Sequence, residues 1–162
     1  MNIFLLLVLA LCLMSVIYQD LKFRLIHVAL PIIISLTGIG FLNFNSIPFY
    51  FIYFNIGFIF LSFLFVFLFF KIKYKSKIKD FFDKYLGVGD VVFYLSISPF
   101  FILTNFILIY ICTLIFSMIL ALIFNKKTSI PLAGYSSILL LILFMLDFLQ
   151  FTNFSIINFG LK

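Results

Sequence analysis

Residues 91–124 read VVFYLSISPFFILTNFILIYICTLIFSMILALIF, and the way this run is divided decides the fold. As a single helix it would be about 50 Å long, whereas the hydrocarbon core of a bilayer is about 30 Å thick. Ser98-Pro99 and Thr104-Asn105 are places at which a helix can break. The sequence therefore predicts two helices here, over about 89–103 and 105–124.

The rest of the chain has the same apolar character. Of its 162 residues, 66% are hydrophobic and 10% are charged, and the mean hydropathy is +1.36. Long apolar runs recur without the alternation of period two that is typical of barrel strands. We therefore expect an all-α, polytopic membrane helix bundle that forms a single domain over residues 1–162. The remaining helices are predicted over about 2–19, 26–43, 49–70 and 131–150.

The positions of the basic residues predict the topology of these six helices. Basic clusters at 22–24, 71–84 and 126–127 follow the first, third and fifth helices, whereas the connections at 43–48 and 104–105 carry no charge. Because basic connections stay in the cytoplasm, both termini are expected on the outer side. The expected location is the inner (cytoplasmic) membrane, crossed in multiple passes.

Composition also excludes several classes of protein. The net charge of +6 comes from short topological clusters, and no segment is long enough to form a basic domain for nucleic acid. Cys12 and Cys112 stand alone in apolar runs and are expected to be packing residues. We expect the lipid bilayer as a partner, and no nucleic acid, metal or cofactor. The sequence leaves the oligomeric state open.

Two carboxylates are the candidates for chemistry. Asp90 ends the tetrapeptide Gly87-Val88-Gly89-Asp90 where a basic loop re-enters an apolar run, and Asp20 ends the first helix on the same side. Ionisable groups at membrane helices are costly to hold and are functional candidates. A close pair of carboxylates shares one proton, so the ionised member can activate water while the protonated member polarises a carbonyl. Gly87 and Gly89 would let an extended substrate approach the backbone beside Asp90.

The remaining acidic residues and the histidine have structural explanations. Asp80 and Asp83 lie among lysines and are expected to balance charge in water. Asp147 lies near the outer end of the last helix, where an interfacial or helix-pairing role is expected. His27 has no His or Cys near it in the sequence, so no metal site is expected there. Taken singly, Asp20 and Asp90 could also be an interfacial charge and a helix N-terminal carboxylate.

Together these features resemble the type IV prepilin peptidase family, which consists of integral-membrane aspartic proteases of the G-x-G-D kind. In that family an Asp after the first helix is followed by basic positions and an Ile, and residues 20–26, DLKFRLI, match this pattern. A third segment, Ile-Pro-Leu-Ala-Gly at 130–134, is similar to the family's Ile-Pro-Phe-Gly-Pro before the last helix.

The resemblance implies an aspartic endopeptidase with Asp20 and Asp90 as the catalytic pair and with Gly87 and Gly89 beside the substrate. Its substrates would be prepilin-like precursors, either type IV pilins or pseudopilins of protein secretion. It would cut their short basic leaders at the cytoplasmic face, after a small residue. Many bacterial members carry a C-x-x-C segment associated with N-methylation. The sequence has no such motif, so a compact member with peptidase activity alone is expected.

Some positions depart from the pattern and leave alternatives open. His27-Val28 stands where the family usually has Pro-Asn, and Val92 stands where a Lys often follows the Asp. A non-catalytic pilin-assembly protein would bind pilin-like helices without cutting them. A small ion-coupled transporter would instead place its acids near the bilayer midplane. The presenilin group has a Tyr-Asp dipeptide, whereas Gln19 separates Tyr18 from Asp20 here, and lipoprotein signal peptidase has outward-facing catalytic Asp residues.

Overall fold

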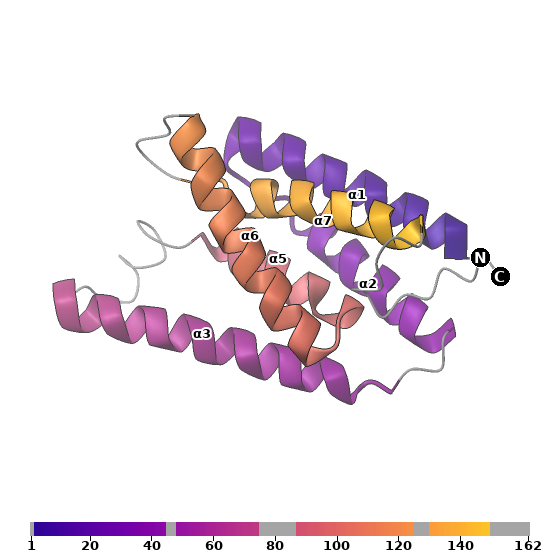
Figure 1. Ribbon diagram of the computed structural model, residues 1–162, viewed down its shortest axis with the longest axis horizontal. Coiled ribbons are helices and arrows are strands. Elements are labelled where there is room, and N and C mark those ends of the chain that lie inside the picture. The colour runs from indigo at the N-terminus through magenta and orange to yellow at the C-terminus, as the bar shows by residue number, and fades with distance from the viewer. Residues whose placement is uncertain (1, 45–47, 75–86, 125–129, 150–162) are drawn as a thin grey trace.

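Helices account for most of the residues that the computed structural model describes, which are 2–44, 48–74, 87–124 and 130–149. The elements in chain order are α1 (Asn2–Phe23), α2 (Ala29–Phe44), α3 (Tyr50–Tyr74), α5 (Val88–Ile97), the 3-10 helix η1 (Ser98–Phe100), α6 (Leu103–Ile123) and α7 (Leu132–Phe148). The described part of the chain contains no β-strand (Figure 1), so the expected all-α class is confirmed.

The long apolar run divides at Pro99, as the sequence predicted. Helix α5 ends at Ile97, η1 contains Pro99, and the extended residues Phe101 and Ile102 lead into α6. Proline has no N–H to donate and cannot continue an α-helix, so backbone carbonyls at the break lose their helical partners. Two separate helices result, in place of one that would be far too long for a bilayer.

A buried amide on α3 satisfies the carbonyls that this break exposes. Asn55 has no exposed surface, and its Nδ2 donates to Ser98 O at 2.8 Å and to Phe101 O at 2.7 Å. An unpaired carbonyl in an apolar environment costs several kcal/mol. Asn55 therefore stabilises the α5–α6 connection and ties α3 to it. The sequence analysis did not single out this residue.

Among the described helices, three are long and apolar enough to cross a membrane. They are the segments Phe4–Phe23, Tyr50–Phe69 and Leu103–Ile123, and they indicate a membrane protein. Only 11% of the Tyr50–Phe69 segment is buried, so most of its apolar surface faces the surroundings of the bundle. The other helices, α2, α5 with η1, and α7, are apolar but shorter. Six passes and outward-facing termini stay predictions.

The bundle is organised around α1 and α7, which lie side by side (Figure 1). Helix α2 packs against α1 and α5, and α6 packs against α7. Helix α3 forms the opposite edge and contacts α6, α5 and η1. The core contains Leu13 and Val16 of α1, Phe93 and Tyr94 of α5, and Phe144 of α7, all buried. This packing brings the end of α1 and the beginnings of α5 and α7 together.

Candidate active site

Asp20 and Asp90 both bind the first turn of α7. The Gly134 N–H donates to Asp20 Oδ2 at 2.6 Å, and the Ala133 N–H donates to Asp90 Oδ1 at 3.1 Å. The Cα atoms of consecutive residues are only about 3.8 Å apart, so the two carboxylates are held as neighbours. They are close enough for the charge of Asp20 to act on Asp90. The structure thus brings the two predicted site residues together.

Helix α1 positions Asp20 in its last turns. The helix continues to Phe23 and not to the expected end at about residue 19, so Asp20 is helical and only 6% exposed. Arg24 ends the helix in the left-handed conformation (φ 57°), and its N–H donates to Asp20 O at 3.2 Å. An abrupt end directly after Phe23 lets the chain turn away while the Asp20 side chain stays inside the bundle.

The G-x-G-D segment positions Asp90 at the start of α5. Gly87 is the exposed residue before the helix, and Gly87 O accepts the Asp90 N–H at 3.0 Å. A Cβ at Gly87 would lie 3.1 Å from Asp90 Oδ2, so the absent side chain leaves room for the carboxylate. A Cβ at Gly89 would lie 3.4 Å from Ile26 Cδ1. Gly89 therefore packs α5 against the α1–α2 connection, and the proposed contact of either glycine with a substrate stays a prediction.

The Pro-Leu-Ala-Gly segment at 131–134 supplies the donors. The first N–H groups of a helix have no partner within the helix, and they carry the positive end of its dipole. Here two of them bind the two carboxylates. A Cβ at Gly134 would lie 3.1 Å from Asp20 Oδ2 and 3.2 Å from Asp20 Cβ, so a larger residue here would push Asp20 by a few tenths of an ångström. From the sequence alone, this segment stands out only by its resemblance to the family's Ile-Pro-Phe-Gly-Pro. Pro131 and Gly134, at the start of a predicted helix, are the features from which the role of this segment in binding the carboxylates could have been recognised.

The charges around the pair favour one negative charge over two. The two amides, the dipole of α7 and the Arg24 guanidinium stabilise an ionised carboxylate. The negative charge of Asp20 opposes a second ionisation at Asp90, and both side chains are largely removed from water. Two neighbouring carboxylates in such surroundings commonly share one proton, which would make one of them a base and the other an acid.

The connection between α1 and α2 contains His27, which caps α2. The Ala29 N–H donates to His27 Nδ1 at 3.3 Å, and the His27 N–H donates to Gln19 Oε1 at 2.9 Å. The imidazole thus performs at the start of α2 the role that an Asn or Ser side chain usually takes. Val92, the other departure from the family pattern, lines a groove of about 160 Å³ between α2 and α5.

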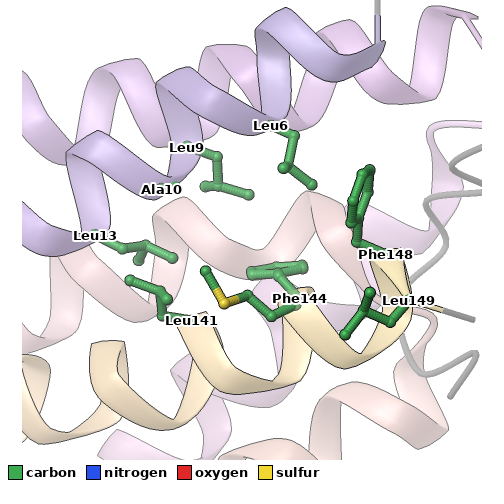
Figure 2. A pocket seen from close by; sticks show the side chains of 9 residues that line it. Leu6, Leu9, Ala10, Leu13, Leu141, Phe144, Phe148 and Leu149 are labelled. Carbon is green, nitrogen blue, oxygen red and sulfur yellow. The ribbon is translucent and has the colours of Figure 1, made fainter. Parts of the chain in front are cut away.

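An apolar cavity of about 240 Å³ lies between α1 and α7, at the ends of these helices far from the carboxylates (Figure 2). Its lining consists of Leu6, Leu9, Ala10, Leu13, Leu141, Phe144, Met145, Phe148 and Leu149. None of these side chains can donate or accept a proton in catalysis. The cavity therefore contributes no chemistry to the site.

The other residues singled out from the sequence lie outside this site. Cys12 is buried, but Cys112 is exposed on α6, so the expectation that both are packing residues is wrong for Cys112. Asp147 is buried near the end of α7, and Asp80 and Asp83 fall outside the described residues. Within the described ranges, no group of three or more His, Cys, Asp or Glu side chains is placed to hold a metal ion.

Comparison of the chain with known protein-family models, curated proteins and solved structures gives no match.

Proposed function

We propose that this protein is a membrane aspartic endopeptidase that removes the short basic leader of prepilin-like precursors at the cytoplasmic face of the inner membrane. One observation carries the proposal: Asp20 and Asp90 come from distant helices and bind consecutive amides of α7. If the two acids only stabilised separate helix ends, they would not have to lie side by side.

The proposed reaction uses the pair as a base and an acid. The ionised carboxylate takes a proton from a water molecule as its oxygen attacks the scissile carbonyl, and the protonated carboxyl donates a hydrogen bond to the carbonyl oxygen. The tetrahedral intermediate then collapses, the C–N bond breaks, and a carboxyl group of the pair protonates the leaving amine. Because the two groups titrate as a unit, neither is assigned a fixed role.

The position of the pair suits a substrate whose own helix lies in the bilayer. Asp20 lies in the last turns of α1, and Asp90 lies in the first turn of α5 beside the exposed Gly87. A leader that precedes a transmembrane helix would reach this depth as the helix enters the membrane. Its positive charges would be drawn to the acidic pair, and anionic lipid headgroups would attract them to the same surface.

The same geometry gives less support to ion-coupled transport. A coupled transporter binds its ion near the bilayer midplane, where broken helices expose backbone groups to a polar cavity. Here both acids are bound to backbone amides at one end of the bundle, and the cavity between α1 and α7 is apolar. A non-catalytic assembly protein is separated from a peptidase by the activity test that follows.

The test is cleavage of a prepilin with a basic leader by the purified full-length protein in liposomes. Wild type is expected to release the leader, and Asp20→Asn and Asp90→Asn should each abolish cleavage because each leaves the pair without its base or its acid. Asp147→Asn is the matched control, a buried Asp at the other end of α7 whose replacement should leave cleavage intact. Mass spectrometry of the products locates the cut. A wild type that does not cut the prepilin, or cleavage that survives in either Asp variant, would contradict the proposal.

A further inference from the structure

One turn below the carboxylates, a buried tyrosine joins three helices. Tyr94 lies four residues after Asp90 and so on the same face of α5, and it has no exposed surface. Its hydroxyl is 2.9 Å from Ser136 Oγ of α7 and 3.0 Å from Thr113 Oγ1 of α6. Ser136 and Thr113 are themselves fully buried.

The number of protons gives these bonds a direction. A hydroxyl group donates one hydrogen. Thr113 Oγ1 donates its hydrogen to Tyr110 O at 2.8 Å, so it accepts from Tyr94, and Tyr94 in turn accepts from Ser136. The bonds form one chain from α7 through α5 to α6, in which the Tyr94 and Thr113 hydroxyls each donate one bond and accept another. Chains of this kind polarise one another and strengthen each bond.

Helices α5 and α7 are therefore tied at two levels. Asp90 bonds to Ala133 at the mouth of the site, and Tyr94 bonds to Ser136 one turn deeper. The spacing is four residues on α5 and three on α7, which is about one helical turn on each. Two bonds one turn apart define both the register and the rotation of one helix against the other, whereas a single bond would define neither.

We propose that Tyr94 is a positioning residue, which holds Asp90 against the Ala133 amide by fixing the register of α5 on α7. This inference rests on the proposed peptidase function for its consequence in catalysis. The surroundings make the deeper tie strong: the Tyr94 ring packs on the Tyr110 ring at 4.8 Å between centroids, beside the buried Phe93. In such an interior a slip of α5 would leave buried hydroxyls unpaired.

The chain offers two matched controls. Ser137, the neighbour of Ser136, is also fully buried, but its Oγ has no hydrogen-bond partner within the described structure. Tyr110 is a second buried tyrosine, and its hydroxyl lies 3.4 Å from Ser62 Oγ of α3. Ser137→Ala and Tyr110→Phe therefore remove the same atoms as Ser136→Ala and Tyr94→Phe without cutting the tie between α5 and α7.

The first measurement is the kinetics of leader cleavage in liposomes. Tyr94→Phe and Ser136→Ala are each expected to lower kcat about tenfold or more with little change in KM, because the substrate binds but the base and acid are misplaced. The double variant should lose no more than Tyr94→Phe alone, because Tyr94→Phe already removes the bond to Ser136. Ser137→Ala and Tyr110→Phe should stay within about twofold of wild type.

The second measurement needs no substrate. Hydrogen–deuterium exchange of the segment 130–137 reports the bonding of the Ala133 amide in the full-length protein. Exchange should be faster in Tyr94→Phe and Ser136→Ala and unchanged in the two controls. If Tyr94→Phe does not fold, Ser136→Ala removes the same bond from the other helix and decides the question.

The outcomes separate this inference from the proposed function. If wild type cuts the prepilin but the Tyr94 and Ser136 variants match their controls in kinetics and exchange, the positioning role is wrong and the peptidase stands. If wild type cuts nothing, the proposed function fails, and hydrogen–deuterium exchange alone decides whether Tyr94 holds α5 on α7. Faster exchange in both Tyr94→Phe and Ser136→Ala supports that role. Unchanged exchange overturns it.

Discussion

Gly134 and Asp20 approach so closely that a side chain on Gly134 would crowd the Asp20 carboxylate. The Gly134 N–H lies 2.6 Å from Asp20 Oδ2, and a Cβ on Gly134 would lie 3.1 Å from the same oxygen. The Asp20 side chain therefore joins the last turns of α1 directly to the backbone of the first turn of α7. This contact is the reason that the 130–134 segment belongs to the candidate active site.

Gly134→Ala is expected to lower the rate of leader cleavage by about tenfold or more, because a shift of Asp20 by a fraction of an ångström spoils its geometry with Asp90. The measurement is kcat with a prepilin substrate. The control is Gly57→Ala on α3, where a Cβ would meet no atom within 4 Å. That variant should keep full activity and can gain up to about 1 kcal/mol of helix stability. Equal activity of the two variants would show that Asp20 does not need its close approach to α7.

Asn55→Leu should destabilise the protein by about 2–4 kcal/mol, since it leaves the Ser98 and Phe101 carbonyls buried without donors. The check is the midpoint of thermal unfolding in detergent. Ser62→Ala serves as the control on the same helix, because Ser62 is only partly buried and donates mainly to its own helix at Ile59 O. An Asn55→Leu variant with the midpoint of wild type would mean that the break at Pro99 needs no amide from α3.

The pH dependence of cleavage should be bell-shaped, because the reaction needs one proton on the Asp20–Asp90 pair. At low pH both carboxyls are protonated and no base is present. At high pH both are ionised and no acid is present, so the rate falls on that side as well. The measurement is kcat/KM against pH in liposomes whose integrity is checked at each pH. A rate that is independent of pH at either extreme would argue against a shared proton.

His27→Ala is expected to cost about 1 kcal/mol, because the Ala29 N–H at the start of α2 loses its side-chain acceptor. His27→Asn should recover most of this loss, since Asn is among the best residues at a helix N-terminus. Thermal unfolding of the three proteins side by side decides the matter. Recovery by Asn would show that the His27 side chain contributes to stability by capping α2. A His27→Asn variant as unstable as His27→Ala would contradict it.

The local features of this fold were predictable from the sequence. Apolar runs predict membrane helices because length and hydropathy are properties of one segment, and Pro99 predicts the break because proline cannot continue a helix wherever it stands. The end of α1 was placed about four residues early, since it depends on the left-handed conformation of Arg24, which composition does not signal.

The candidate site depended on tertiary structure. From the sequence, Asp20 and Asp90 are candidates because carboxylates at membrane helices are costly, and the predicted topology puts them on one side of the membrane. Only packing decided that both would bind adjacent amides of α7, that Gly134 would make room for one of them, and that Tyr94 would tie the same helices deeper in the bundle. These contacts join residues far apart in the chain. They form because polar groups inside an apolar bundle are stable only where another helix presents a partner.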